Sequence, residues 1–413
     1  MSGMPSTTLV LILSLAVPIL AQTPAELIND ATVRLAMEAA RRNEPRTLDA
    51  QARICQIPAP PFHEEKRGLE FQRLFQELHL QNVRIDKVGN VIGVRPGRSA
   101  HPNLVFAAHL DTVFPEGTDV RVTRMGTLMK GPGISDDCRG LALMLAVIRA
   151  LDEGHVRTPG TITFVADVGE EGLGDLRGMK SLFFDTLKGQ IDKFVSVDGT
   201  GFGLTHVGVG SNRYKVTFRG PGGHSYGAFG MANPIQAMGR AIAKIDAFQV
   251  PSQPKTTFNV GRVGGGTSVN AIPFEAWMEV DMRSVDPGAL KELDARFHAA
   301  IQQAVSEENA RWDGRGAVTA SAELVGVRPA GQTPKDSAIV ETALAVSRAM
   351  HIDEALREGS TDANVPMNLG IPAITISGGG DGAGVHSLNE SFDARDSWRG
   401  TQSALLLAVA LAR

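Results

Sequence analysis

Three apolar stretches of this chain end in acidic residues or histidine, and this recurrence constrains the fold more than any other feature. The stretches are residues 104–109, 161–167 and 191–197. Apolar, β-branched runs of this length predict buried strands, which are typical of a sheet with helices on both faces. Open α/β sheets place their functional sites at the carboxyl ends of their strands. We therefore predict that the polar residues following these runs converge on one site.

The residues at these ends are of the types that bind metals. His109 and Asp111 close the first run, Glu170 and Glu171 follow the second, and Asp198 follows the third. On an extended chain, side chains two residues apart point to the same side. We therefore expect the side chains of His109 and Asp111 to point towards the same site. Adjacent carboxylates repel and resist leaving water, so a bound cation is the simplest compensation for the Glu170–Glu171 pair. An exposed acidic turn is the alternative.

A second acidic pair precedes a predicted helix. Asp136 and Asp137 end the segment G-P-G-I-S-D-D, and an apolar helix is expected over residues 140–151. Asp is a favoured N-cap residue, which would explain one of the two carboxylates. The other is then free for a second function.

The order of predicted elements divides the chain. Residues 210–328 show the order β-α-β-β-α-β, which is ferredoxin-like. We predict an inserted α+β domain there, within a larger α/β domain that comprises residues 22–209 and 329–413. Helices are expected over residues 24–42, 47–54, 64–78, 336–350 and 401–411, with Leu35 and Leu69 among the inward-facing residues.

The N-terminus predicts export. Leu9 to Ala21 is an apolar run too short for an ordinary membrane span, so residues 1–21 are interpreted as a signal peptide and the protein as secreted or periplasmic. The segment before this run has no Lys or Arg, which leaves an uncleaved anchor as the alternative. Cys55 and Cys138 could form one disulfide, which would suit export, but the sequence does not establish it. The net charge of −4 gives no sign of nucleic-acid binding.

Two glycine-containing motifs have other interpretations. Residues 223–227 match the G-x-S-x-G pattern of serine hydrolases. However, Gly220, Pro221, Gly222 and Gly223 lie between Ser225 and its predicted strand, and no helix follows directly. The glycine runs at 264–266 and 378–380 lack the Gly-Lys-Ser/Thr of a phosphate-binding loop. Neither motif predicts an active site by itself.

Six motifs in order resemble one family. They are H-L-D-T-V at His109, G-P-G-I-S-D-D at Gly131, G-E-E-G at Gly169, V-D-G at Val197, G-x-x-G-H-S at Gly220 and H-S at His386. From about residue 50 onward the chain is similar to the two-zinc exopeptidases, which include glutamate carboxypeptidase, bacterial tripeptidase, aminoacylase and succinyl-diaminopimelate desuccinylase. Where the family often has D-D-K-G or D-x-K-G, this chain has Asp136-Asp137-Cys138-Arg139-Gly140. Cys138 is interpreted as a packed helix residue rather than a soft metal ligand.

The resemblance implies that the larger α/β domain is a zinc-exopeptidase-like catalytic domain with a mixed sheet between helices. It also implies a role for each motif residue. One zinc would be bound by His109 and Asp198 and the other by Glu171 and His386, with Asp136 bridging them and joined to Asp137 by an unusual, possibly cis, peptide. Glu170 would be the general base and Asp111 would orient His109. Contacts to the substrate would come from the inserted domain, through His224, Asn270 and Arg283. In dimeric members the residue equivalent to His224 reaches the partner's site.

These roles describe an amide hydrolase. We expect an exopeptidase for short peptides that uses a metal-bridging hydroxide, with zinc, cobalt or manganese as possible metals. A deacylase of N-acyl amino acids on the same site is the alternative, because both reactions need an amide and a carboxylate. A non-catalytic peptide-binding protein on this fold is a further alternative, although such proteins usually lose a ligand or the base. The inserted domain is expected to act as a lid and to form a homodimer.

Overall fold

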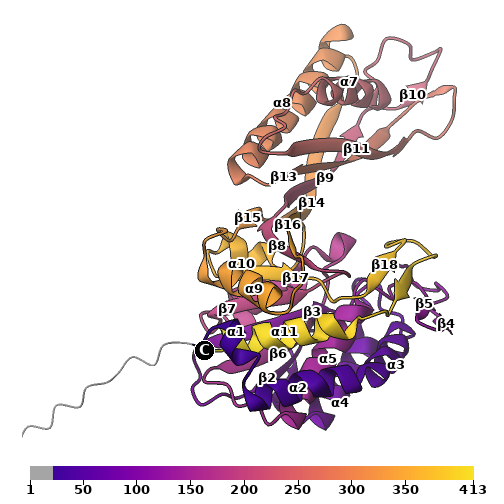
Figure 1. Ribbon diagram of the computed structural model, residues 1–413. Coiled ribbons are helices and arrows are strands. Elements are labelled where there is room, and N and C mark those ends of the chain that lie inside the picture. The colour runs from indigo at the N-terminus through magenta and orange to yellow at the C-terminus, as the bar shows by residue number, and fades with distance from the viewer. Residues whose placement is uncertain (1–21) are drawn as a thin grey trace, which may run out of the picture.

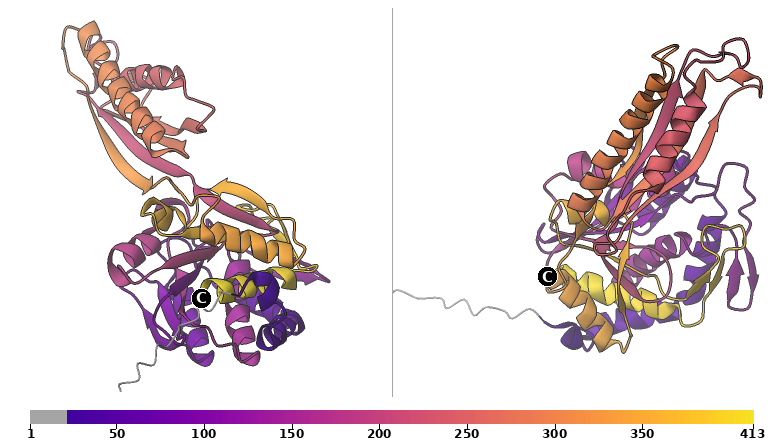
Figure 2. Two further views of the ribbon diagram at one scale, coloured as in Figure 1. Left: turned by 60° about the vertical axis from the view of Figure 1, so that its left-hand side comes forward. Right: turned by 90° about the horizontal axis from the view of Figure 1, so that it is seen from above.

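The computed structural model describes residues 22–413, so the predicted signal peptide lies outside the described residues. The chain forms two bodies joined by two strands, with the inserted unit (residues 210–328) extending away from the larger one (Figures 1 and 2). Each body has its own sheet and its own hydrophobic core. In the described part of the chain, no helix is long and apolar enough to span a membrane.

The larger body is built on a nine-stranded mixed sheet. Its strand order is β1-β2-β6-β3-β7-β17-β8-β15, with β16 paired to β8. The three predicted strands lie side by side at its centre, and β3 pairs parallel with both β6 and β7. The strands span Gln81–Ile85 (β1), Val91–Arg95 (β2), Asn103–His109 (β3), Thr161–Asp167 (β6), Lys193–Val197 (β7), Gly203–Gly208 (β8), Gly331–Gln332 (β15), Ala355–Gly359 (β16) and Ala373–Ile376 (β17).

Both faces of this sheet are buried, as the continuous apolar runs predict. Within β3, Leu104 and Phe106 join one core cluster while Val105 and Ala107 join another on the opposite face. The first cluster includes residues of the helices α1 (Pro24–Leu27), α2 (Ala31–Arg42), α3 (Glu44–Cys55), α4 (Glu65–Glu77), α5 (Cys138–Glu153), α9 (Ala338–Ala349) and α11 (Trp398–Leu411). The second cluster is covered by α6 (Arg177–Ser181), by a π-helical turn at Leu182–Thr186 and by α10 (Asn364–Asn368).

The inserted unit confirms the predicted β-α-β-β-α-β order. Its sheet is antiparallel with strand order β11-β13-β9-β14, and α7 and α8 contribute to the core on one face. The elements span Gly210–Arg219 (β9), Pro234–Asp246 (α7), Thr256–Gly265 (β11), Glu275–Ser284 (β13), Pro287–Arg311 (α8) and Thr319–Arg328 (β14). A two-stranded ribbon, β10 (Gly223–His224) with β12 (Ala271–Ile272), lies at its far end (Figure 1).

Two of the predicted helices differ from the structure, one in its extent and both in the residues that they bury. The helix expected over residues 24–42 is broken, because the Asp30 carboxylate caps a new helix start by accepting from the backbone N–H of Thr32 and Val33. Leu35 and Leu69 are each 58% exposed. In α4 the buried face instead includes Arg67, because its guanidinium donates to backbone carbonyls inside the fold.

A small antiparallel sheet beside the main one was not predicted. It contains β4 (Thr123–Met125), β5 (Leu128–Lys130), β18 (Asp381–Ala383) and β19 (Ser391–Asp393). Pairing of β19 with β5 joins segments more than 250 residues apart, and β18 lies within the glycine-rich turn that precedes His386. Strands of three residues carry too little periodicity to be recognised from sequence.

Cys55 and Cys138 form a disulfide, which the sequence had left open. Their Cα atoms lie 5.5 Å apart, within the usual range for a disulfide, and both side chains are fully buried. The bond joins the end of α3 to the first residue of α5, directly after Asp136 and Asp137. Cys138 is therefore a covalent anchor beside the acidic pair, and the interpretation of it as a simple packed residue is incomplete.

Reduction of this disulfide should destabilise the protein. The bridge spans 83 residues, and removing a native disulfide typically costs about 2–5 kcal/mol, chiefly because the unfolded chain regains freedom. The free energy of unfolding in guanidinium chloride, measured with and without reductant, checks this. The Cys55→Ser/Cys138→Ser double variant should match the reduced wild type; equal stability of oxidised and reduced protein would contradict the expectation.

Candidate metal centre

The predicted convergence at the carboxyl edge of the sheet is present. His109 is the last residue of β3, Asp198 directly follows β7, and the Glu170–Glu171 turn begins three residues after β6. His386 arrives from the loop after β18 and Asp136 from the loop before α5. Parallel strands end at one edge, and this geometry brings together residues that are distant in the sequence.

Asp136 lies at the centre of the cluster. One of its carboxylate oxygens is 3.1 Å from His109 Nε2, and the other is 3.0 Å from His386 Nε2. His386 Nε2 is also 2.9 Å from a Glu171 carboxylate oxygen. The two imidazoles thus contact different oxygens of the same carboxylate.

The donor atoms fall into two groups that share Asp136. His109, Asp136 and Asp198 form one group and Asp136, Glu171 and His386 the other, each with its atoms within 4.8 Å of one another. A mixed imidazole and carboxylate set of this kind suits zinc, and a shared carboxylate suits a pair of ions. His109, Glu170 and Glu171 also satisfy the distance. However, Glu170 is engaged elsewhere, as described below.

Asp137 has the capping role that the sequence suggested for one acid of the pair. Its Oδ1 accepts from Gly140 N at 3.0 Å at the start of α5, and its Oδ2 accepts from His109 N at 3.2 Å. Asp137 therefore contacts the helix start, while Asp136 contacts His109 and His386. The Asp136–Asp137 peptide is cis, as the resemblance implied was possible.

Asp111 contacts His109 differently from the expectation. The Asp111 backbone oxygen lies 3.0 Å from His109 Nδ1, whereas the nearer carboxylate oxygen is 3.7 Å away. The carboxylate instead accepts from the backbone N–H groups of Gly169, Glu170 and Glu171 at 2.8–3.1 Å. Asp111 consequently holds the acidic turn with its side chain and the His109 ring with its main chain.

Arg328, at the end of β14, was not predicted as a site residue. Its guanidinium donates to a Glu170 carboxylate oxygen at 2.9 Å, to the Glu170 backbone oxygen and to Ser360 Oγ. Only 5% of Arg328 is exposed, so the ion pair is shielded from water. In a strand where polar and apolar residues alternate, an arginine is expected to face solvent. The sequence therefore contains no signal for this contact.

Burial and charge shift the pKa values of the cluster strongly. Hydrogen bonds to Asp136 and Glu171 raise the pKa of His386 to about 10. Burial opposes the charged form of His109, but its hydrogen bond to Asp136 and the nearby carboxylates hold its pKa well above the usual value. Burial, reinforced by the charge of Asp136, raises the pKa of Asp198. Burial also raises the pKa of Glu170, against the opposing charge of Arg328. In the absence of metal, the imidazoles are the counter-ions of the carboxylates.

A second buried acidic pair lies next to the cluster of candidate metal ligands. Asp167, beside His109 on the neighbouring strand, and Asp362 are both almost fully buried. Burial raises the pKa of Asp167 to about 8 and that of Asp362 well above its usual value. These carboxyls therefore favour the neutral form and add little charge to the site.

The structure does not bring the predicted substrate residues His224 and Asn270 to the cluster. His224 lies in β10 and Asn270 just before β12, at the far end of the inserted unit (Figures 1 and 2). Arg283 lies near the end of β13, which is closer to the joint between the two bodies, and forms an ion pair with Asp281 at 2.7 Å. Ser225 follows β10 in a turn on the inserted unit, and α7 begins only at Pro234. This placement contradicts the serine-hydrolase interpretation.

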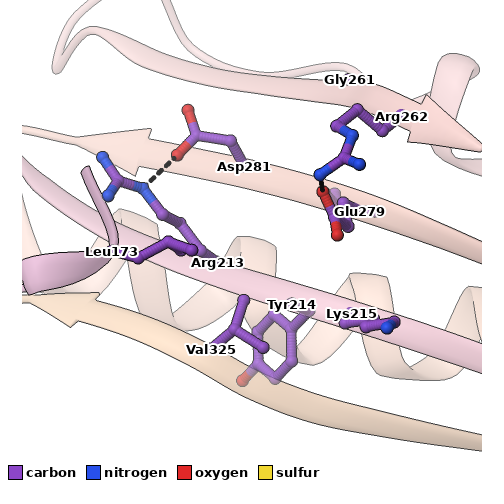
Figure 3. Close-up of a pocket in the computed structure, with 10 residues that line it drawn as sticks. Leu173, Arg213, Tyr214, Lys215, Gly261, Arg262, Glu279, Asp281 and Val325 are labelled. Atoms are coloured by element: carbon purple, nitrogen blue, oxygen red, sulfur yellow. Dashed lines mark hydrogen bonds and ion pairs between the residues drawn. The ribbon is translucent and has the colours of Figure 1, made fainter. Parts of the chain in front are cut away.

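A cavity of about 500 Å³ lies on the open face of the inserted sheet. Its wall combines apolar residues such as Val325 with ion pairs between Arg213 and Asp281 and between Arg262 and Glu279 (Figure 3). Leu173, from the turn that carries Glu171, closes one side. Arg213 also donates to the Gly172 backbone oxygen at 2.8 Å. The inserted sheet thus contacts the acidic turn directly.

Comparisons with known proteins agree with this geometry. The model of peptidase family M20/M25/M40 matches residues 105–410. The uncharacterised protein YqjE of Bacillus subtilis is 25% identical over 368 residues, covering 85% of this chain and 94% of YqjE. The cytosol non-specific dipeptidase of Escherichia coli is 24% identical over 63% of this chain and 58% of that enzyme. Other matches are named carboxypeptidase G2 and acetylornithine deacetylase.

The fold also has solved counterparts. A tripeptidase from Staphylococcus aureus superimposes with a TM-score of 0.73 at 21% identity, covering 90% of this chain and 99% of that one. At this identity the similarity concerns the fold alone. Because the family model spans most of the chain and includes every candidate ligand, this protein belongs to peptidase family M20/M25/M40, whose members are metallopeptidases and related amidohydrolases.

Proposed function

We propose that this chain is a two-zinc exopeptidase that removes a terminal residue from short peptides. The observation that carries the proposal is the pair of donor groups that share Asp136. His109 and Asp198 would hold one ion, and Glu171 and His386 the other. When bound, two such ions polarise a scissile carbonyl and lower the pKa of water. Cobalt or manganese would also suit these ligands.

Glu170 is the proposed general base. It neighbours the ligand Glu171, but the Arg328 ion pair holds its carboxylate at the edge of the cluster. Its carboxylate is buried, and that burial raises its pKa, which is the direction expected for a group that accepts and returns a proton. It would take a proton from water and pass it to the leaving amine.

The substrate class rests on the relatives and on the charge of the joint region. Dipeptidases, carboxypeptidases and a deacetylase match this chain, and their substrates share an amide bond. Arg283 supplies a cation that could bind a substrate carboxylate. A deacylase for N-acyl amino acids is the second candidate, favoured by the match to acetylornithine deacetylase.

We assign the inserted unit as a lid and dimerisation domain. His224 and Asn270 lie at its far end, so they could contact a substrate only after a large closure or in a second subunit. A homodimer that places His224 in the partner's site accounts for this arrangement. The buried disulfide supports a secreted or periplasmic location, because such bonds persist in oxidising compartments.

Metal removal and loss of the base should have separable effects. Protein purified without added metal should contain about two zinc ions per chain, and chelation should abolish hydrolysis of a di- and tripeptide panel. Glu170→Gln should lower kcat about 10²–10⁴-fold while both ions stay bound. Elemental analysis and peptide kinetics measure both effects. An active metal-free enzyme would contradict the proposal, and a metal-free protein that stays inactive with zinc would favour a binding protein.

Zinc binding should release protons at neutral pH. The pKa of metal-free His386 is about 10, so its imidazole is protonated at pH 7 and must lose that proton to bind a metal. The apparent zinc affinity should therefore increase from pH 6 to 9. Calorimetric titrations in buffers with different ionisation enthalpies count the released protons. An affinity independent of pH would show that neither imidazole binds the metal.

A mixture of two inactive variants should recover activity if His224 acts across the dimer. In a heterodimer of Glu170→Ala and His224→Ala subunits, one site combines an intact Glu170 with an intact His224. Random reassociation should restore about a quarter of wild-type activity, because half of the dimers then have one complete site of two. Activity is measured after unfolding and refolding the mixture together. No recovery from a dimeric mixture would place His224 in its own subunit's site.

A further inference from the structure

We propose that Glu390 is a positioning residue that locks the Asp136 loop and the His386 loop into one metal-binding unit. The proposal rests on the proposed function, because it assumes that Asp136 and His386 bind metal. Glu390 follows His386 by four residues and is fully buried. Neither the motifs nor the family match gives it a role.

The Glu390 carboxylate binds the loop that carries Asp136 through four hydrogen bonds. Its Oε1 accepts from Ser135 N at 2.8 Å, from Ser135 Oγ at 2.6 Å and from Asp136 N at 3.0 Å. Its Oε2 accepts from Gly133 N at 3.0 Å. Every contact is a donor to the carboxylate, so only a group with two acceptor oxygens satisfies all four.

The main chain of the same residue strengthens the connection. The Glu390 backbone oxygen accepts from Gly131 N at 3.1 Å, and the next residues pair β19 with β5. The Asp136 and His386 side chains are 3.0 Å apart, although 250 residues separate them in the chain. Glu390 is thus the buried side chain that links the backbone of the bridging ligand to the loop of a terminal ligand.

This arrangement should favour metal binding by pre-ordering the ligands. Without this support the loop that carries Asp136 would be free to adopt other conformations, and a bound cation would first have to order it. Replacing a residue that hydrogen-bonds to a metal ligand and orients it typically lowers metal affinity about 10–100-fold. We expect an effect of this size for Glu390.

Glu390→Gln is the direct test. The amide keeps one acceptor oxygen but places an NH₂ group against an N–H donor, so the loop loses at least one hydrogen bond. Zinc affinity is measured by competition with a chromophoric chelator, and the visible spectrum of the cobalt-loaded protein reports ligand geometry. We expect about 10–100-fold weaker binding of at least one ion and an altered cobalt spectrum.

Glu308→Gln provides a matched control. Glu308 is also a fully buried carboxylate, in the inserted unit, and accepts from Asn233 N, Arg240 Nε and Trp312 Nε1 at 3.0 Å. Its replacement should lower thermal stability without changing zinc affinity. Equal loss of zinc affinity in both variants would overturn the proposal, because the effect would then be general destabilisation.

A milder variant covers the case in which Glu390→Gln does not fold. Ser135→Ala removes only the hydroxyl donor at 2.6 Å and leaves the backbone contacts in place. It should weaken zinc binding several-fold in the same direction; unchanged affinity and cobalt spectrum in the folded variants would overturn the proposal. A wild-type protein that binds no metal would overturn both the proposed function and this proposal. A wild type that binds zinc, with variants of unchanged affinity, would overturn only the role of Glu390.

Discussion

The repulsion among buried carboxylates at one edge of the sheet is the constraint on which the rest of this structure depends. Asp136, Glu171 and Asp198 converge there, with Glu170 and Asp111 directly behind them. Taking such a group out of water is unfavourable without positive charge. Two imidazoles and one guanidinium are the nearby cations in the described residues that contact these carboxylates. A metal pair would replace the protons on the imidazoles and serve the same electrostatic purpose.

A ring of supporting contacts keeps these groups in place before any metal binds. Asp111 holds the Glu170–Glu171 turn by three backbone N–H groups, Asp137 caps α5, and Glu390 binds the loop of Asp136. The Cys55–Cys138 disulfide joins the end of the same loop to α3. Because each support comes from a different segment, the ligand positions are determined by the packed fold rather than by local chain geometry.

The inserted unit is connected to this centre at the joint. Arg328 of β14 binds Glu170, and Arg213 of β9 binds the oxygen of Gly172. The neighbouring Val327 is held by Asp175 at its N–H and by Lys180 at its carbonyl. Both strands that join the two bodies therefore contact the acidic turn. A change in the angle of the inserted unit would therefore act on Glu170 through these contacts.

The sequence by itself determined the class of the site and the order of the elements. Apolar runs of six or seven residues predict strands because both faces of the sheet are buried, and their polar ends identify His109, Glu170, Glu171 and Asp198. The helix starting after Asp137 and the β-α-β-β-α-β order of residues 210–328 also follow from local pattern. Leu35 and Leu69 were placed wrongly because helical spacing alone does not say which apolar stripe faces the core.

Only the tertiary structure decided the long-range contacts. The Cys55–Cys138 bond, the Arg328–Glu170 ion pair and the four hydrogen bonds to Glu390 join segments that are 83, 158 and more than 250 residues apart. The structure also placed His224 and Asn270 away from the metal centre, although the resemblance implied that both contact the substrate. Such contacts depend on how strands and loops pack in space. No periodicity or spacing along the chain encodes that packing, whereas the hydrophobic pattern of each strand is local and can be read directly.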